Sequence, residues 1–186
     1  MRKVPLIGIT GPAGAGKDTV GRHLVFEHGF TQYAFAKPIK DMLSVIGFSA
    51  KKFEDREMKE AIIPELGVSY RTMAQTLGTE WGRGLNQNFW LQIAKMHYQG
   101  LCETSFCRGL VITDVRFENE ADFIRQHGTL IHLRGRSSSL SGLAKLHSSE
   151  AGIIPCEVDY TLENRKSIPD LLAAVDVFMG AFKDGQ

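Results

Sequence analysis

A glycine-rich stretch near the N-terminus carries the residues best suited to chemistry. Residues 11–17 fit the pattern G-x-x-x-x-G-K and follow the apolar run 6–9. Between a strand and a helix, such glycines let backbone N–H groups converge on phosphate oxygens, and the helix adds its positive end. Lys17 supplies an ammonium group for the β- and γ-phosphates. The pattern predicts a nucleoside triphosphate site formed by Gly11, Ala13, Gly14, Ala15, Gly16, Lys17, Asp18 and Thr19.

The residue after Lys17 departs from the usual form of this motif. It is normally Ser or Thr, whose hydroxyl binds Mg²⁺, whereas here it is Asp18, with Thr19 one place later. A carboxylate can also hold Mg²⁺, directly or through water, because that ion prefers oxygen ligands. Alternatively, the macrodipole favours Asp18 as an acid in the first helical turn, and Thr19 alone meets the phosphates. The sequence leaves both alternatives open.

A second acidic group is predicted at the tip of an apolar strand, residues 110–113. Proteins with such a phosphate loop place a Mg²⁺-associated carboxylate there, and Asp114 occupies this position. Arg116 follows and can present two donors to a phosphate beside the acid. The competing interpretations are a turn or cap residue for Asp114 and an ion pair of Arg116 with Glu118 or Glu120.

Further basic residues are expected in loops at the same edge of the sheet. Lys37 follows the second predicted strand, and Arg134 and Arg136 follow the fourth. Arg71 and Arg83 flank a predicted helix end with a glycine stop. Phosphoryl transfer needs cations aligned on two phosphates and little covalent chemistry. The group of cations, rather than any one of them, therefore indicates phosphoryl transfer.

The elements that must position these groups follow from the apolar pattern. Short buried strands separated by helices, as parallel units require, are expected at 4–10, 31–35, 110–113, 129–133 and, most weakly, 159–162. Helices are expected at 19–27, 119–127 and 168–182, and shorter helical stretches at 38–46, 53–63, 69–77 and 89–98. The shorter stretches belong to a long insertion, 38–106. Such an insertion commonly caps the carboxyl ends of the strands, where ligands bind.

Composition limits the class of protein. A chain of 186 residues, 43% apolar and 23% charged, is typical of one soluble globular domain, 1–186. With 22 basic and 21 acidic residues, nothing favours a broad surface for nucleic acid or membrane. Cys102, Cys107 and Cys156 lack zinc-site spacing and are expected to be reduced thiols. No apolar run approaches membrane-spanning length, and the first strand leaves no room for a signal peptide, so a cytoplasmic protein is expected.

Several motifs together are similar to those of one family. They are GKDT at 16–19, FAKPIK at 35–40, R-x-x-x-Q-x-x-G-T-E-x-x-R at 71–83, DVRFENE at 114–120 and HSSE at 147–150. In this order and spacing, from the first strand to about Asn164, the chain resembles the phage-type deoxynucleoside monophosphate kinases. These enzymes use ATP to convert dNMPs to dNDPs.

The resemblance implies an α/β P-loop kinase fold, with a five-stranded parallel sheet flanked by helices and the 38–106 insertion binding the acceptor. It implies ATP as phosphoryl donor, Mg²⁺ as cofactor with Asp18 as a candidate ligand, and Lys17, Asp114 and Arg116 as catalytic residues. Arg134 and Arg136 would join the ATP site. The implied acceptor contacts are Lys37, Arg71, Gln75, Thr79, Arg83, Trp90, Asp114 and Arg116.

Some assignments stay open beside this resemblance. Trp90 is either a base-stacking platform or a core aromatic, and the role of His147 is ambiguous. The serine-rich segment 135–142 is expected to be mobile and to close over the phosphates, yet residues 135–146 contain only Arg136 and Lys145 where several lid arginines are expected.

Two other functions compete. One is a P-loop kinase of another phosphorylated acceptor, such as phosphomevalonate or dephospho-coenzyme A. The other is a nucleotide-binding module without turnover, against which stands the absence of an Asn-Lys-x-Asp motif for guanine. Neither nucleic acid nor membrane is an expected partner, a homodimer is left open, and the location is the host cytoplasm if the chain is phage-encoded.

Overall fold

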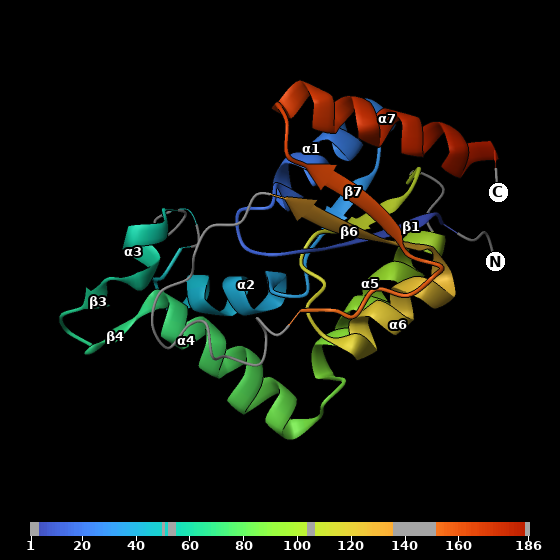
Figure 1. Ribbon diagram of the computed structural model, residues 1–186. Coiled ribbons are helices and arrows are strands. Elements are labelled where there is room, and N and C mark those ends of the chain that lie inside the picture. The colour runs from blue at the N-terminus through green and yellow to red at the C-terminus, as the bar shows by residue number, and fades with distance from the viewer. Residues whose placement is uncertain (1–3, 50, 52–54, 104–106, 136–151, 185–186) are drawn as a thin grey trace. The chain divides into compact units, whose positions relative to one another are not determined.

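The chain folds into two compact units, seen in a computed structural model that describes residues 4–49, 51, 55–103, 107–135 and 152–184. One comprises Met1–Ala34 and His97–Gln186 and is called here the sheet unit. The other comprises Phe35–Met96 and is called the helical unit. Figure 1 shows the course of the chain through both. The expected division into a core and an acceptor-binding insertion stays a prediction.

The sheet unit is built on five parallel strands in the order β2-β5-β1-β6-β7. They are β1 (Leu6–Thr10), β2 (Thr31–Tyr33), β5 (Leu110–Ile112), β6 (Thr129–Gly135) and β7 (Tyr160–Asn164). All five predicted strands are confirmed. β6 runs two residues further than predicted because Arg134 and Gly135 pair with Glu163 and Asn164 of β7. The central strand β1 is the one that leads into the phosphate loop.

Helices cover both faces of this sheet (Figure 1). On one face lie α1 (Lys17–His28) and α7 (Ile168–Asp184), and on the other lies α6 (Glu118–His127). Alternate residues of a strand point to opposite faces, so Ile7 and Ile9 join the core shared with α1 and α7. The predicted end of α1 is confirmed, because Gly29 adopts a left-handed cap with φ of 71°. The predicted apolar face of α7 buries Leu171 and Val175.

The helical unit contains α2 (Lys37–Val45), α3 (Arg56–Glu60), α4 (Tyr70–Thr76), a wide π-helical segment η2 (Leu77–Arg83) and the start of α5 (Phe89–Glu103). The predicted helix 53–63 is wrong at its end, because Ile62–Ile63 forms strand β3 and pairs with β4 (Val68–Ser69). Two β-branched residues favour the extended backbone there. The unit has its own core, made by Ile39, Leu43, Tyr70 and Trp90.

The predicted glycine stop at Gly78 is also wrong. The chain continues through Gly78 in the π-helical segment η2, whose wide turns end at Arg83. The Gly78 carbonyl accepts a hydrogen bond of 2.6 Å from the indole Nε1 of Trp90. A Cβ atom on Gly82 would lie 2.5 Å from the same indole ring. These glycines therefore make room for a tryptophan rather than ending a helix.

Among the helices in the described part of the chain, none combines the length and the apolar character needed to cross a membrane.

Candidate active site

The predicted phosphate loop lies between β1 and α1, and its shape requires glycine. Gly11 has φ of 144° and Gly16 has φ of 100°, a region that other residues rarely adopt. A Cβ atom on Gly11 would lie 2.4 Å from the Leu133 carbonyl oxygen. The loop therefore packs directly against the backbone of β6. The amide groups of the loop lie at the N-terminal end of α1.

Asn164 fixes this loop from the last strand of the sheet. Its side chain is buried, and its Nδ2 donates a hydrogen bond of 2.8 Å to the Ala15 carbonyl. Its Oδ1 has no hydrogen-bond partner among the described residues. A Cβ atom on Gly16 would approach Nδ2 to 2.9 Å. Sequence reasoning missed Asn164, although a polar residue ending a strand at the ligand-binding edge is the signal that could have found it.

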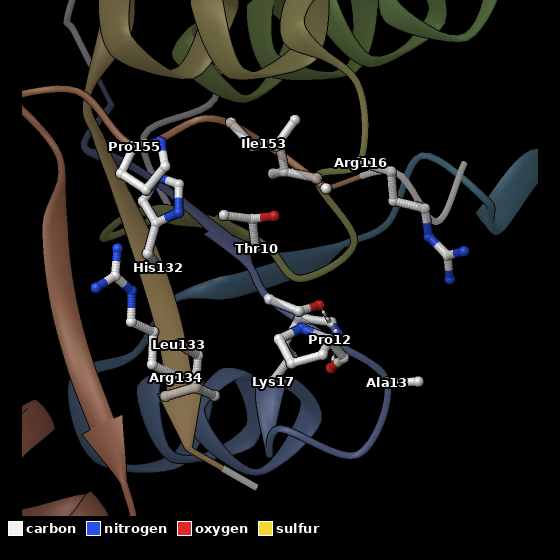
Figure 2. A pocket seen from close by; sticks show the side chains of 13 residues that line it. Thr10, Pro12, Ala13, Lys17, Arg116, His132, Leu133, Arg134, Ile153 and Pro155 are labelled. Atoms are coloured by element: carbon white, nitrogen blue, oxygen red, sulfur yellow. Dashed lines mark hydrogen bonds between the residues drawn. The ribbon is translucent and has the colours of Figure 1, made fainter. Parts of the chain in front are cut away.

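Lys17 is the first residue of α1, and its side chain turns back over the loop. The ammonium Nζ donates to the carbonyl oxygens of Gly11 at 2.6 Å and Pro12 at 2.8 Å (Figure 2). The cation therefore already stands at the loop where phosphates would bind.

A cavity of about 360 Å³ opens beside the loop. Besides the loop itself, the cavity is lined by the end of β1, the turn after β5, the end of β6 and the segment 152–155. Lys17 of α1, Arg116 of the turn after β5 and Arg134 of β6 line this space, and in Figure 2 the two arginine side chains point to opposite sides of it. Of the predicted site residues, the structure thus brings together Gly11, Ala13, Lys17, Arg116 and Arg134.

The two predicted acids lie close to this cavity in the chain. Asp114 is half-buried in the turn after β5, which is tied to β1 by the hydrogen bond from Val115 N to Ile9 O at 3.2 Å. Asp18 is exposed in the first turn of α1, and Thr19 is half-buried. Both alternatives for Asp18 therefore stay open.

The acids that competed for Arg116 have other recorded partners. Glu118 accepts from Ile154 N at 2.9 Å and from Arg125 Nη1 at 3.3 Å. Glu120 accepts the backbone N–H groups of Arg116 and Phe117 at 2.9 and 3.2 Å, which caps α6. Arg116 is an exposed residue that lines the cavity, although its guanidinium points away from Lys17 in Figure 2. The ligand-binding role of Arg116 and its pairing with one of these acids therefore both stay open.

Sequence reasoning missed His132, which lines the cavity and belongs to a buried ionic cluster. Its Nε2 lies 2.9 Å from Oδ2 of Asp159, whose side chain is 1% exposed. Arg125 donates to both carboxylate oxygens, at 3.0 and 2.8 Å, and Cys156 N donates at 3.0 Å. A histidine in an apolar strand gave no local signal, because its partner Asp159 lies 27 residues away.

The Asp159 carboxylate stays ionised although it is buried. Burial by itself raises the pKa of this group, but the hydrogen bonds from Arg125, Cys156 N and His132 outweigh it, so its pKa lies well below the usual range. A permanent negative charge therefore stands behind His132, and it orients the imidazole at the cavity wall.

The predicted acceptor contacts in the helical unit have mixed surroundings. Lys37 is exposed and pairs with Asp41 at 2.6 Å, and Arg71 lies 3.5 Å from Glu60. Arg83 is buried and donates to the Gln87 carbonyl at 3.0 Å.

The remaining acceptor candidates of this unit also vary in burial. Gln75 and Thr79 are half-buried. Trp90 is buried in the core, which favours the core-aromatic alternative over base stacking. Asp114 and Arg116 belong to the sheet unit. A shared role of these residues with those of the helical unit stays a prediction.

Arg136, Lys145 and His147 lie outside the described residues, as does the serine-rich segment apart from Gly135.

Comparison with known proteins places the chain in a family. The sequence model of the deoxynucleotide monophosphate kinases matches residues 45–175, more than half of the chain. A protein of Acanthamoeba polyphaga mimivirus named for deoxynucleotide monophosphate kinase is 29% identical over 184 residues, covering 91% of this chain and 93% of its own. The deoxynucleoside-5'-monophosphate kinase of Escherichia phage T5 is 25% identical, with 86% of this chain and 81% of its own covered.

A solved structure extends the comparison to the fold. A gluconokinase from Sinorhizobium meliloti 1021 superposes with a TM-score of 0.53 at 13% identity, covering 99% of this chain and 97% of its own. The predicted P-loop kinase fold is thus confirmed by the parallel sheet and by this likeness. With a phosphate loop, a cationic cavity beside it and a family match over most of its length, this chain belongs to the deoxynucleotide monophosphate kinase family.

Proposed function

We propose that the protein transfers the γ-phosphoryl group of ATP to a deoxynucleoside monophosphate, giving a dNDP and ADP. An oxygen of the acceptor's phosphate forms the new bond to the γ-phosphorus, and the bond from that phosphorus to the bridging β-oxygen breaks. The observation that carries the proposal is the cavity beside the phosphate loop, which Lys17, Arg116 and Arg134 line. Family membership supports a dNMP over phosphomevalonate or dephospho-coenzyme A as acceptor.

The donor phosphates are assigned to the loop and its cations. Backbone N–H groups of the phosphate loop, apart from Pro12, which has none, and the N-terminal end of α1 stabilise negative charge on the β-phosphate. Lys17 exchanges its bonds to the Gly11 and Pro12 carbonyls for phosphate oxygens. Arg134 approaches the same phosphates from the end of β6. Little covalent chemistry is needed, because transfer depends on charge and alignment.

Magnesium fits the oxygen donors beside the loop. Asp18 and Thr19 stand in the first turn of α1, and Asp114 stands in the turn after β5. Carboxylate and hydroxyl oxygens are the ligands this ion prefers. When bound, Mg²⁺ would neutralise charge on the β- and γ-phosphates.

The acceptor phosphate is assigned to Arg116 and to the cations of the helical unit. Arg116 is exposed and planar, so it can bind a phosphate through two donors. Lys37 and Arg71 are the accessible cations proposed for the acceptor in the helical unit, since Arg83 is held to a backbone carbonyl. His132, backed by Asp159, adds a hydrogen-bonding group to the cavity wall.

The test is coupled ADP release with ATP and a panel of acceptors. Turnover with dNMPs should exceed that with NMPs, dephospho-coenzyme A and phosphomevalonate. Lys17→Ala should lower kcat at least ~10²-fold, the scale seen when one preorganised electrostatic group is removed. Lys51→Ala is the matched control, because Lys51 is an exposed lysine far along the chain from the loop, and it should leave the rate unchanged.

Two results would contradict the proposal. Near-normal turnover by a folded Lys17→Ala protein would remove the assigned role of the loop. ADP release that no dNMP increases would favour a binding module without turnover.

A further inference from the structure

A second cluster of chemically competent side chains joins α1 to α7, outside the phosphate cavity. His23 and His28 belong to α1, and Asp176 belongs to α7. Figure 1 shows the two helices side by side on one face of the sheet. His28 is eleven residues after Lys17 on the same helix, which is roughly 16 Å at 1.5 Å per residue. The cluster is therefore separate from the proposed active site.

The three side chains converge on one point. The Nε2 atoms of His23 and His28 lie 2.7 and 2.8 Å from the same carboxylate oxygen, Oδ1 of Asp176. One donor atom from each residue lies within 4.8 Å of the other two. The two imidazole rings stand at 72° to each other, 5.7 Å apart, and both present Nε2 to the Asp176 carboxylate.

The chemistry of the donors matches a borderline divalent metal ion. Imidazole nitrogen with carboxylate oxygen is a ligand set for Zn²⁺, and three protein ligands leave one position for water. At bond lengths of about 2.0–2.1 Å, tetrahedral ligand atoms stand roughly 3.3 Å apart. The two distances from Nε2 to Oδ1 would then open by about half an ångström, and the Asp176 side chain, which is 52% exposed, has room to move.

The surroundings also favour a cation. Both imidazoles are largely buried, with 12% of each side chain exposed, so their orientation is restricted before any ion arrives. His28 ends α1, where the carbonyl end of the helix carries partial negative charge.

We propose that His23, His28 and Asp176 form a Zn²⁺ site that links the end of α1 to α7. The bound ion replaces the shared hydrogen bonds with three metal–ligand bonds. Because α1 begins at the phosphate loop and α7 packs on the same core, the ion connects two elements that support the loop. The site needs no nucleotide, and its binding is measurable without turnover.

The experiment is calorimetric titration of Zn²⁺ into untagged, chelator-treated protein without nucleotide, with Co²⁺ absorption as a second readout. One ion should bind per chain, the Co²⁺ bands should indicate four-coordination, and Zn²⁺ should raise Tm. His23→Ala, His28→Ala and Asp176→Asn should each weaken binding at least ~10-fold, since even indirect ligand partners are worth 10–100-fold.

Matched controls separate this site from other donors. His97→Ala removes an exposed imidazole of α5, and Cys156→Ala removes an exposed thiol; both should keep full affinity. His23→Gln provides a second variant if His23→Ala does not fold. Equal binding by the cluster variants and the wild type would overturn the proposal. The proposal would also be overturned if the wild type bound no Zn²⁺ and the cluster variants only had a lower Tm. That result would assign hydrogen bonding alone to the cluster.

Discussion

Two carboxylates in the described part of the chain each contact histidine, and they differ in burial and in their other partners. Asp159 is 1% exposed, contacts His132 and accepts hydrogen bonds from two atoms of Arg125, Nε and Nη2. Asp176 is 52% exposed and meets His23 and His28. Aspartate and histidine therefore form a buried ionic contact at Asp159, whereas at Asp176 they form the proposed metal-ligand set. The two sites differ in the burial of the carboxylate and in the presence of Arg125, a permanent cation, beside Asp159.

The largest expected effect comes from neutralising the buried carboxylate. Asp159→Asn leaves the largely buried Arg125 without its main counter-charge, and breaking such a pair typically costs roughly 3–5 kcal/mol of unfolding free energy. Urea denaturation measures this loss. Asp122→Asn is the matched control, because Asp122 also contacts Arg125 but is 61% exposed. Comparable losses in the two variants would break the contrast between buried and exposed carboxylates.

The removal of an exposed arginine from the cavity should instead affect the rate. Arg116→Ala should lower kcat/KM by roughly 10²-fold, the scale for one preorganised donor. Arg116→Lys should be nearly as slow, because a lysine cannot bind a phosphate through a planar pair of donors. Tm should be unchanged in both, and Arg22→Ala, an exposed arginine of α1, should be silent. A fall in Tm with a normal rate would assign Arg116 a structural role like that of Arg125.

The unfolding free energy that Asp159 contributes should depend on pH. The pKa of Asp159 is depressed in the folded protein, so its contribution is fully present above the unfolded value of about 4 and is lost as pH falls through the folded value. Unfolding free energy of the wild type should therefore decrease below about pH 4. Asp159→Asn should show a flatter profile, measured by denaturation from pH 2 to 7. An identical slope in the two proteins would contradict the assigned charge state.

The smallest effect is expected at the cluster of His23, His28 and the half-exposed Asp176. In chelator-treated protein, Asp176→Asn should change the unfolding free energy by less than about 1 kcal/mol, as is usual for exposed ion pairs. The difference should grow when Zn²⁺ is added, because only the wild type gains binding energy. A large loss without metal would mean that the cluster supports the fold by itself.

Local pattern explains how much of this molecule could be predicted. The phosphate loop and the five strands are each encoded by a run of neighbouring residues, so they could be predicted from the sequence. The positions of Lys17, Asp114 and Arg116 beside these elements could be predicted in the same way. The π-helical segment was missed because it depends on Trp90, which lies in the next helix. The Trp90 indole bonds to the Gly78 carbonyl and packs against Gly82.

Long-range partners explain what could not be predicted. Asp159 meets Arg125 across 34 residues, and Asp176 meets His23 across 153. No spacing rule relates such residues, because the strand order of the sheet brings them together. Single acids and histidines on strands or helices are ordinary in a sequence, and only the fold makes them a cluster.

The bond from Asn164 to the phosphate loop has a consequence for the order in which the protein is made. The donor lies 149 residues after the acceptor carbonyl, at the end of β7. The two neighbours of β1 in the sheet, β5 and β6, also come from the second half of the chain. At about 5–20 residues per second, the ribosome releases the first strand and its loop several seconds before their supports exist. The earliest motif to be synthesised is therefore among the last to become competent to bind a nucleotide.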